Sequence, residues 1–215
     1  MKTKTNFTAS GFTFLEAIVV IAILCVLLIL IIPDMSPGRA RAQRINCVNN
    51  ERQISLAFKQ WEFGDKFPMQ VSVTNGGTME LVASDIVWSH FQVMSNELNT
   101  PKVLVCPADA DRQYAWSFTS NFNNSAISYF VGVDAVDTQP QMFLIGDRNL
   151  SCNGTNLNCG LHEIWTNSPI AWTEQLHVKQ GNVALADGSV QGLSNNKLRE
   201  GLRATGVATN RLAIP

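Results

Sequence analysis

The strongest constraint on the fold of this 215-residue chain is an apolar run near its N-terminus. Residues 12–32 contain a single charged side chain, Glu16, and after it no polar side chain except Cys25. A helix over this range would be about 31 Å long, close to the thickness of the hydrocarbon core of a bilayer. The run therefore predicts a helix that spans a membrane.

Two other interpretations of the run fit less well. A helix in the core of a soluble domain would have to be apolar on every side for about six turns. A secretory signal peptide would explain the basic residues Lys2 and Lys4, but its apolar region has only about 7–15 residues and ends at a small-x-small cleavage site. Here the polar and bulky segment 33–35 (Pro-Asp-Met) follows the run instead.

The composition of the whole chain excludes two further classes. Its 16 basic and 17 acidic residues give a formal net charge of −1, and charged residues make up only 15% of the chain. This balance argues against a strongly basic nucleic-acid-binding protein and against an acidic disordered chain, so no nucleic-acid partner is expected. The length allows one core of moderate size.

Glu16 is unusual because a carboxylate is costly on a helix inside a bilayer, although less so near the edge. It could reach back to the membrane interface, which lies about one turn away. It could also pair with a buried positive charge. Cleavage of the chain just before Phe12 would create such a charge, a free amine four residues away in the sequence.

The segment 10–16 (Ser-Gly-Phe-Thr-Phe-Leu-Glu) resembles the prepilin signal of type IV pilins and pseudopilins. It combines a short basic leader, Gly11 before the cut, Phe12 after it, Glu16 at the fifth mature position and the long apolar helix. The resemblance implies that a prepilin peptidase cleaves after Gly11 and methylates the amine of Phe12. It also implies that Glu16 pairs with the terminal amine of a neighbouring subunit during filament assembly, where a buried ion pair would specify register.

Charge alone does not orient the helix, because basic residues lie on both sides of it. The resemblance implies a single-pass protein of the bacterial inner membrane, with a cytoplasmic N-terminus and a periplasmic or extracellular C-terminal domain. It also implies four partners: the prepilin peptidase, copies of the chain itself, other pseudopilins, and the assembly platform of a type IV pilus or a type II secretion system.

The sequence divides into four parts: a leader at 1–11, the membrane helix at 12–32, an amphipathic continuation at 33–63 and an exported domain at 64–215. Pro33 and Pro37 predict a kink between the two helical parts. The apolar residues that follow recur at helical spacing and predict an amphipathic helix over 39–63. Pilin-like proteins have such a long N-terminal helix, half of it packed on a small sheet domain.

The rest of the pattern predicts an α+β, pilin-like fold with a small antiparallel sheet. We expect a helix over 84–98, a short buried strand at 103–105, and strands at 126–133 and 141–145. Residues 183–186 and 189–193 predict a hairpin with a type I′ turn at Asp187 and Gly188. A short terminal helix is expected over 195–202.

Five cysteines occur, and Cys25 lies in the apolar run. The other four, an even number in an exported domain, favour disulfides between Cys152 and Cys159 and between Cys47 and Cys106. Free thiols are an alternative. A metal site is the least favoured, because the chain has no CxxC motif, and no metal ligands are predicted.

Downstream features extend the resemblance to a large pseudopilin-like family. Its members combine the prepilin signal with a His-x9-Asp-Gly segment, here His177, Asp187 and Gly188. Ser189 departs from the aromatic residue or histidine common in the family at that position, which leaves any ligand role of His177 open. The alternatives are a catalytic or metal pair of His177 and Asp187, or a plain hairpin turn with His177 as an edge residue.

No known catalytic motif is present, so we do not predict an enzyme. No cofactor is expected either. Two pairs of loop carboxylates, Asp109 with Asp111 and Asp134 with Asp137, offer oxygen ligands for calcium, but their spacing matches no full calcium-loop motif and favours solvated side chains. The expected function is that of a pilin or pseudopilin, which polymerises through its N-terminal helix. The alternative is a membrane-tethered extracellular module that binds a ligand without polymerising.

Overall fold

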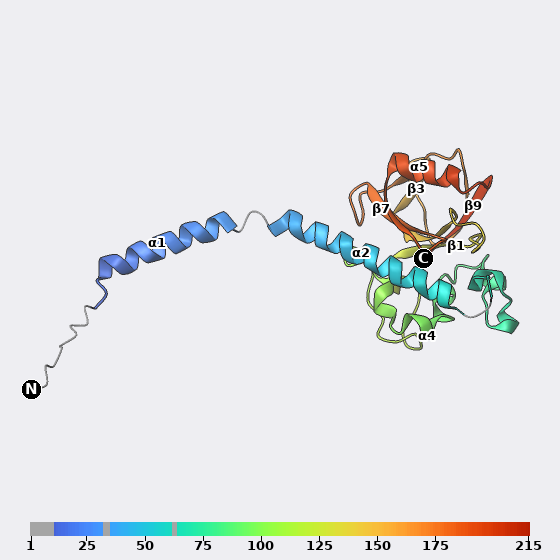
Figure 1. The fold of residues 1–215 in the computed structure, drawn as a ribbon, viewed down its shortest axis with the longest axis horizontal. Coiled ribbons are helices and arrows are strands. Elements are labelled where there is room, and N and C mark those ends of the chain that lie inside the picture. Colours follow the sequence, from blue (N-terminus) through green and yellow to red (C-terminus); the bar gives the residue numbers. More distant parts are fainter. Residues whose placement is uncertain (1–10, 32–34, 62–63) are drawn as a thin grey trace, which may run out of the picture. The chain divides into compact units, whose positions relative to one another are not determined.

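The structure is a computed structural model that describes residues 11–31, 35–61 and 64–215, without the side chains of 29–31 and 35–37. The chain divides into two compact units, Met1–Arg41 and Ala42–Pro215. Figure 1 labels the principal elements of both units.

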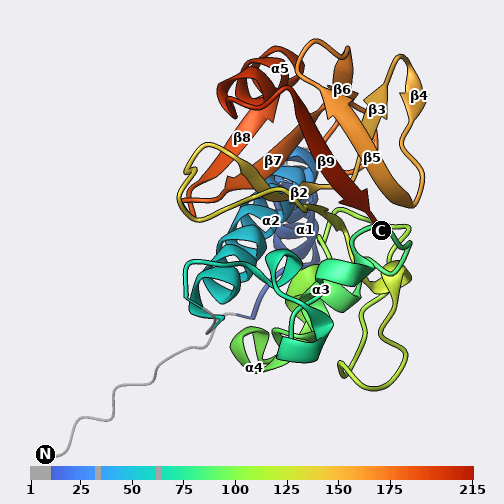
Figure 2. The same cartoon turned by 90° about the vertical axis from the view of Figure 1, so that its right-hand side faces the viewer.

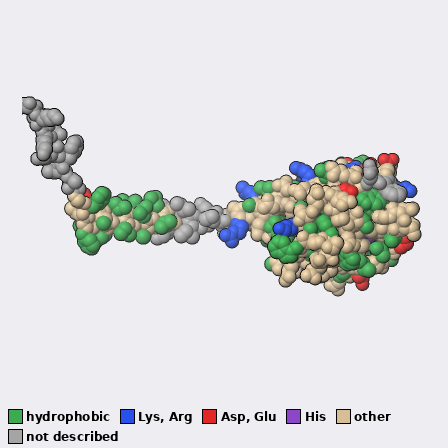
Figure 3. Space-filling view, turned by 90° about the horizontal axis from the view of Figure 1, so that it is seen from below, with side chains coloured by type: hydrophobic (Ala, Val, Ile, Leu, Met, Phe, Trp, Pro, Cys, Tyr) green, Lys and Arg blue, Asp and Glu red, His purple; other side chains and the backbone are tan. Residues whose placement is uncertain are grey.

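The first unit contains the helix α1 (Phe14–Ile31). Its apolar side chains are exposed as far as Leu28, and Figure 3 shows hydrophobic side chains over its visible face. Among the described residues, no helix is both long and apolar enough to cross a membrane. The predicted span 12–32 and the predicted kink at Pro33 to Pro37 both extend into positions outside the described residues.

The helix α2 (Met35–Gln60) begins four residues before the predicted start at 39 and ends before 63. It includes Pro37 in its first turn, where a backbone N–H has no partner within the helix and proline is therefore tolerated. Its second half belongs to the second unit. There Cys47, Ile54 and Phe58 are fully buried at helical spacing, so this face of α2 packs against the core.

The strands of the second unit form two antiparallel sheets, and their bounds are β1 (Tyr129–Gly132), β2 (Phe143–Asp147), β3 (Leu150–Cys152), β4 (Thr155–Asn156), β5 (Gly160–Trp165), β6 (Ile170–Trp172), β7 (Gln180–Leu185), β8 (Val190–Ser194) and β9 (Thr209–Ile214). The larger sheet has the order β5-β9-β1-β2-β7-β8, and the smaller has the order β4-β3-β6. The predicted α+β class, with an N-terminal helix on an antiparallel sheet, is confirmed.

Both faces of the six-stranded sheet are covered (Figure 2). Side chains alternate between two cores: Tyr129 and Val131 of β1 pack on the side of α2, while Phe130 packs on the opposite side. The helix α5 (Asn195–Ala204) and the three-stranded sheet cover that opposite side through Leu198, Trp172 and their neighbours. The sheet is therefore the middle layer of the second unit.

The predicted helix over 84–98 is wrong. The chain forms two short helices instead, α3 (Ser89–Gln92) and α4 (Ser95–Leu98). The side chain of Asn124 accepts a hydrogen bond from the backbone N–H of Trp88 and donates one to the carbonyl of Asp85. These tertiary bonds engage backbone groups that a continuous helix would need.

The predicted strand at 103–105 is also wrong, because Pro101–Leu104 form a 3-10 helix that Thr100 caps. Other 3-10 turns lie at Pro68–Gln70, Val73–Asn75, Met79–Leu81 and Asn124–Ala126. The last of these replaces the beginning of the strand predicted at 126–133. The strand predicted at 141–145 forms as β2, two residues later.

The predicted hairpin and terminal helix form as β7, β8 and α5. The turn, however, is not type I′, which needs positive φ at two successive residues. Only Gly188 has a positive φ there, at 89°, while the N–H of Gly188 donates to the carbonyl of Leu185 and the N–H of Leu185 donates to Ser189. This is the pattern of a three-residue loop with glycine in the left-handed position.

Candidate functional site

The N-terminal turn of α1 contains the residues of the prepilin-like motif. The backbone N–H and the hydroxyl of Thr13 each donate to the carboxylate of Glu16, both at 2.8 Å, and the N–H of Glu16 reaches the Thr13 hydroxyl at 3.4 Å. This is a capping box, which satisfies backbone N–H groups at the start of a helix. The carboxylate of Glu16 therefore lies against the residue that directly follows Phe12.

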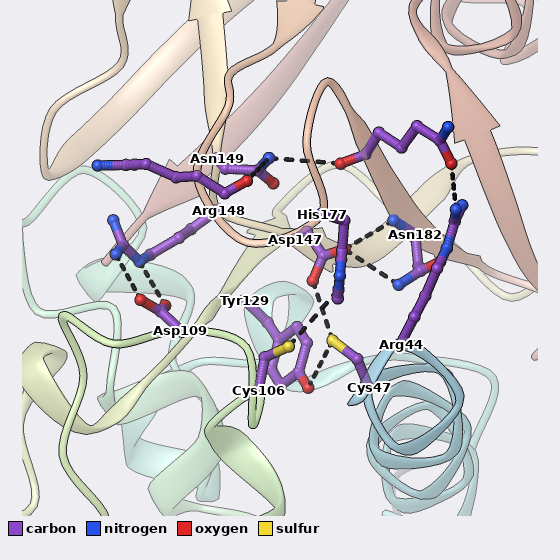
Figure 4. Close-up of polar contacts among 12 residues, drawn as sticks. Arg44, Cys47, Cys106, Asp109, Tyr129, Asp147, Arg148, Asn149, His177 and Asn182 are labelled. Atoms are coloured by element: carbon purple, nitrogen blue, oxygen red, sulfur yellow. Dashed lines mark hydrogen bonds and ion pairs between the residues drawn. The ribbon is translucent and has the colours of Figure 1, made fainter. Parts of the chain in front are cut away.

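A second candidate site lies in the second unit, where four segments distant in the sequence meet (Figure 4). Cys47 comes from α2, Cys106 from the loop after the 3-10 helix Pro101–Leu104, Asp147 from the end of β2 and His177 from the loop between β6 and β7. One ligand atom from each residue lies within 4.8 Å of the other three. Such convergence requires the whole tertiary fold.

The four side chains contact one another directly. The Sγ of Cys47 donates to Oδ1 of Asp147 at 3.2 Å, and Nε2 of His177 lies 3.6 Å from Oδ2 of Asp147. The Sγ of Cys106 lies 3.6 Å from the same Nε2 of His177. Both thiols and the carboxylate are fully buried, and the His177 side chain is only 3% exposed.

Burial and mutual contact shift the pKa values of this cluster. Burial raises the pKa of Asp147 and of the Cys47 thiol. The hydrogen bond from Cys47, with help from His177, lowers the pKa of Cys106 to about 7. Burial alone would lower the pKa of His177, but Cys106 and Asp147 outweigh it and raise that pKa. The contacts therefore shift the pKa values of Cys106 and His177 toward each other.

Other groups hold the four side chains in place. Asn182 donates to Oδ2 of Asp147 through its backbone N–H at 2.7 Å and through its side-chain amide at 3.1 Å. The backbone N–H of Ala108 forms a hydrogen bond with Cys106, and the Tyr129 hydroxyl lies 3.3 Å from the Sγ of Cys47. These contacts orient the side chains of Asp147, Cys106 and Cys47 toward one another.

The loop that carries His177 has an uncommon backbone. Leu176, Val178 and Lys179 have φ of 59°, 51° and 57°, in the left-handed region that few residues other than glycine adopt. For the β-branched Val178 this conformation is strained. The strain persists because the surrounding structure fixes the loop, with the imidazole turned into the cluster.

Glu51 lies one helical turn after Cys47 on α2 and is fully buried. Neither of its carboxylate oxygens has a hydrogen-bond partner among the described residues. Burial raises the pKa of Glu51 well above its usual range, and the nearby Asp147 and Cys106 raise it further. The cluster therefore has a fourth acidic group beside it.

The predicted disulfides do not form in the structure, where all five cysteines are free thiols. Cys47 and Cys106 do come together, but each contacts a cluster partner, Asp147 or His177. Cys152 and Cys159, the other predicted pair, are also free. The Sγ of Cys159 accepts from the side chain of Asn124 at 3.1 Å, whereas Cys152 lies in β3.

The His-x9-Asp-Gly segment does not act as one pair. His177 is buried in the cluster, so its interpretation as an edge residue is wrong, and its carboxylate partner is Asp147 rather than Asp187. Asp187 is exposed and accepts from the N–H of Ser189 inside the hairpin turn. Gly188 supplies the positive φ of that turn and accepts, through its carbonyl, from the hydroxyl of Ser55 on α2.

Sequence reasoning missed Asp147, Glu51, Tyr129 and Asn182. A weak signal existed for Asp147, since it is a charged residue that ends the apolar segment 143–146.

The four loop carboxylates that offer ligands for calcium have partners within the chain. Arg148 donates to both oxygens of Asp109 at 2.8 Å and to Asp111 at 3.2 Å. Asp134 pairs with Arg211, and Asp137 pairs with Lys59. Each of these carboxylates therefore forms an ion pair with arginine or lysine.

The chain matches no protein-family model, no curated protein and no solved structure. The expectation of a pilin-like protein therefore depends on the sequence motifs alone.

Proposed function

We propose that this chain is a pilin-like structural subunit that polymerises through its N-terminal helix into a type IV pilus or a type II secretion pseudopilus. In this proposal a prepilin peptidase cleaves after Gly11 and methylates Phe12. The helix beginning at Phe12 rests in the inner membrane before assembly, and the domain from 64 onward lies on the outer side.

The observation that carries the proposal is the surface of α1. Its apolar residues are exposed on every side, and Leu15, Ile21 and Leu28 each expose more than half of their side-chain surface. Water disfavours so large an apolar surface, so this helix needs lipid or other apolar helices around it. Repeated contacts between identical helices, offset along one axis, build a filament rather than a closed ring.

Glu16 would set the offset between neighbouring subunits. In the precursor, its carboxylate accepts from Thr13 in the capping box. After cleavage, the amine of Phe12 would be a charged donor one residue before Thr13. In a filament the amine of a neighbouring subunit would offer Glu16 a charged partner in an apolar core, where an unpaired carboxylate is costly.

The first prediction separates the role of Glu16 in capping the helix from its role in pairing with the amine of a neighbouring subunit. Glu16→Gln keeps an acceptor at the third helical position, which a capping box allows, but it removes the negative charge. We expect Glu16→Gln and Glu16→Ala to abolish filament formation, measured by electron microscopy and by shearing of cells. The mature N-terminus should still be methylated Phe12 by mass spectrometry.

The matched control is Thr13→Ala, which removes the capping hydroxyl and leaves the charge of Glu16 in place. We expect this variant to assemble. Normal filaments from Glu16→Gln would count against the assembly role, and so would a mature chain that begins at Met1 or well beyond residue 32.

The second candidate function is a tethered ligand-binding module. An exposed aromatic residue favours it: Trp116 is 82% exposed, and the centroid of its ring lies 4.7 Å from the ammonium of Lys102. Such an exposed ring could contact a sugar ring of a ligand. An unpolymerised chain at the cell surface that loses ligand binding in Trp116→Ala would support this candidate.

A further inference from the structure

The distances within the cluster resemble those of a tetrahedral metal site. Four ligands at about 2.0–2.3 Å from a zinc ion lie about 3.3–3.8 Å from one another. The Sγ of Cys47 lies 3.2 Å from Oδ1 of Asp147, and Nε2 of His177 lies 3.6 Å from the Sγ of Cys106 and 3.6 Å from Oδ2 of Asp147. One ligand atom from each of the four residues lies within 4.8 Å of the other three. Cys47 and His177 contact different oxygens of Asp147, so the side chains would move closer together to place one atom of each residue around a single ion.

The chemistry of the ligands selects the ion. Two thiolates and an imidazole are soft or borderline ligands, which zinc accepts readily and which calcium and magnesium avoid. We propose that Cys47, Cys106, Asp147 and His177 bind a zinc ion in the second unit. The proposal is independent of filament assembly.

The site is closed, as in structural zinc sites. All four ligand side chains are buried and come from the protein, so no coordination position remains for a substrate. The bonds from Asn182 to Asp147 and from Ala108 to Cys106 are the outer contacts that orient metal ligands. The strained loop at His177 is a further cost that a bound ion would offset.

Glu51 provides an observation independent of the four ligands. It is fully buried beside them, and both of its oxygens lack a hydrogen-bond partner among the described residues. A buried carboxyl group without partners is costly, and the thiols of Cys47 and Cys106 and the carboxylate of Asp147 are near enough to interact with it electrostatically. A divalent cation among these acidic groups would supply the missing positive charge.

The position of the ion indicates a structural role, which is to link separate elements of the second unit. It would connect α2 with the end of β2 and with two loops that have no sheet bonds of their own at Cys106 and His177. The amphipathic helix would then be fixed to the sheet domain through a metal–thiolate bond at Cys47. In an assembled filament, force on the domain would pass to the helix at this junction.

The test measures metal in the full-length chain, purified in detergent after expression with added zinc and then dialysed. We expect about one zinc ion per chain by elemental analysis. Replacement of zinc by cobalt should give the thiolate-to-cobalt charge-transfer band and the intense visible bands of a tetrahedral site. These spectra need no variant and so do not depend on the folding of a mutant.

Variants then locate the ion. We expect Cys47→Ser and His177→Gln to lose most of the bound zinc, and Asn182→Ala to bind it about 10–100-fold more weakly. The double variant Cys152→Ser with Cys159→Ser is the matched control and should keep the full complement. A purified wild-type chain without zinc and without the cobalt spectrum would overturn the proposal. So would a Cys47–Cys106 disulfide found by non-reducing mass spectrometry.

Discussion

His90 is a fully buried histidine with one partner for its ring, the hydroxyl of Thr78 at 2.7 Å from Nδ1. Its Nε2 has no hydrogen-bond partner among the described residues. Burial lowers the pKa of His90 to about 4, because a charged imidazole would be poorly solvated there. The folded chain therefore keeps this ring neutral at pH values where an unfolded chain protonates it.

This difference predicts a loss of stability in acid. Between pH 6.5 and about 4 the unfolded chain binds a proton at His90 that the folded chain does not, so the free energy of unfolding falls as the pH falls. The total loss from this residue is about 3 kcal/mol. Urea unfolding of the full chain between pH 7 and 4, compared with His90→Gln, measures it.

We expect His90→Gln to show a shallower pH dependence than the wild type, whatever its stability at pH 7. His162→Gln is the matched control, since it removes a half-buried histidine on β5. Equal slopes for the wild type and His90→Gln would contradict the prediction.

At the scale of single elements, amphipathic pattern and tertiary contact compete. In α5 the pattern decides: Leu198 and Leu202 lie one turn apart and are fully buried against the sheet, while Lys197 is exposed. In the segment 84–98 tertiary contact decides, because Asn124 binds backbone groups of the predicted helix. The predicted helix therefore forms where its apolar face packs against the core, as in α5.

Leu198→Ala tests the packing of α5. The deletion leaves a cavity between α5 and the six-stranded sheet, and we expect a loss of about 2–5 kcal/mol in the free energy of unfolding. Chemical denaturation of the full chain gives the value. Lys197→Ala, the exposed neighbour, should change it by less than about 0.5 kcal/mol. Similar losses for the two variants would show that α5 does not close the core.

At the scale of the whole molecule, the question is which part of the chain can fold alone. The unit Ala42–Pro215 has two buried cores of its own, which include the second half of α2. Its six-stranded sheet is complete only when the last strand is in place, since β9 lies between β5 and β1. We therefore expect residues 42–215 to fold alone, but not without β9.

A chain of residues 42–215 should unfold cooperatively, and its Tm should differ from that of the full chain by no more than about 2–4 °C, the shift that 1 kcal/mol produces at this size. Calorimetry at equal zinc concentration measures both. A chain of residues 42–206 lacks β9 and is the comparison, for which we expect no cooperative transition. Folding of that shorter chain would refute the central role of β9.

The sequence by itself determined what depends on neighbouring residues. The apolar run predicted the helix α1, the periodicity predicted α2, and the Asp187-Gly188 pair placed the hairpin, because each signal comes from local geometry. The motif at Gly11, Phe12 and Glu16 is likewise contiguous, and it supports the proposed function without any knowledge of the fold.

Only the tertiary structure decided which distant residues meet. Cys47 and Cys106 come together as the expected pairing required, but Asp147 and His177 join them as a mixed cluster in place of a disulfide. No spacing in the sequence could reveal this, because the four ligands belong to a helix, two loops and a strand end. Their meeting depends on packing α2 against the sheet, and packing sums many weak contacts across the whole chain.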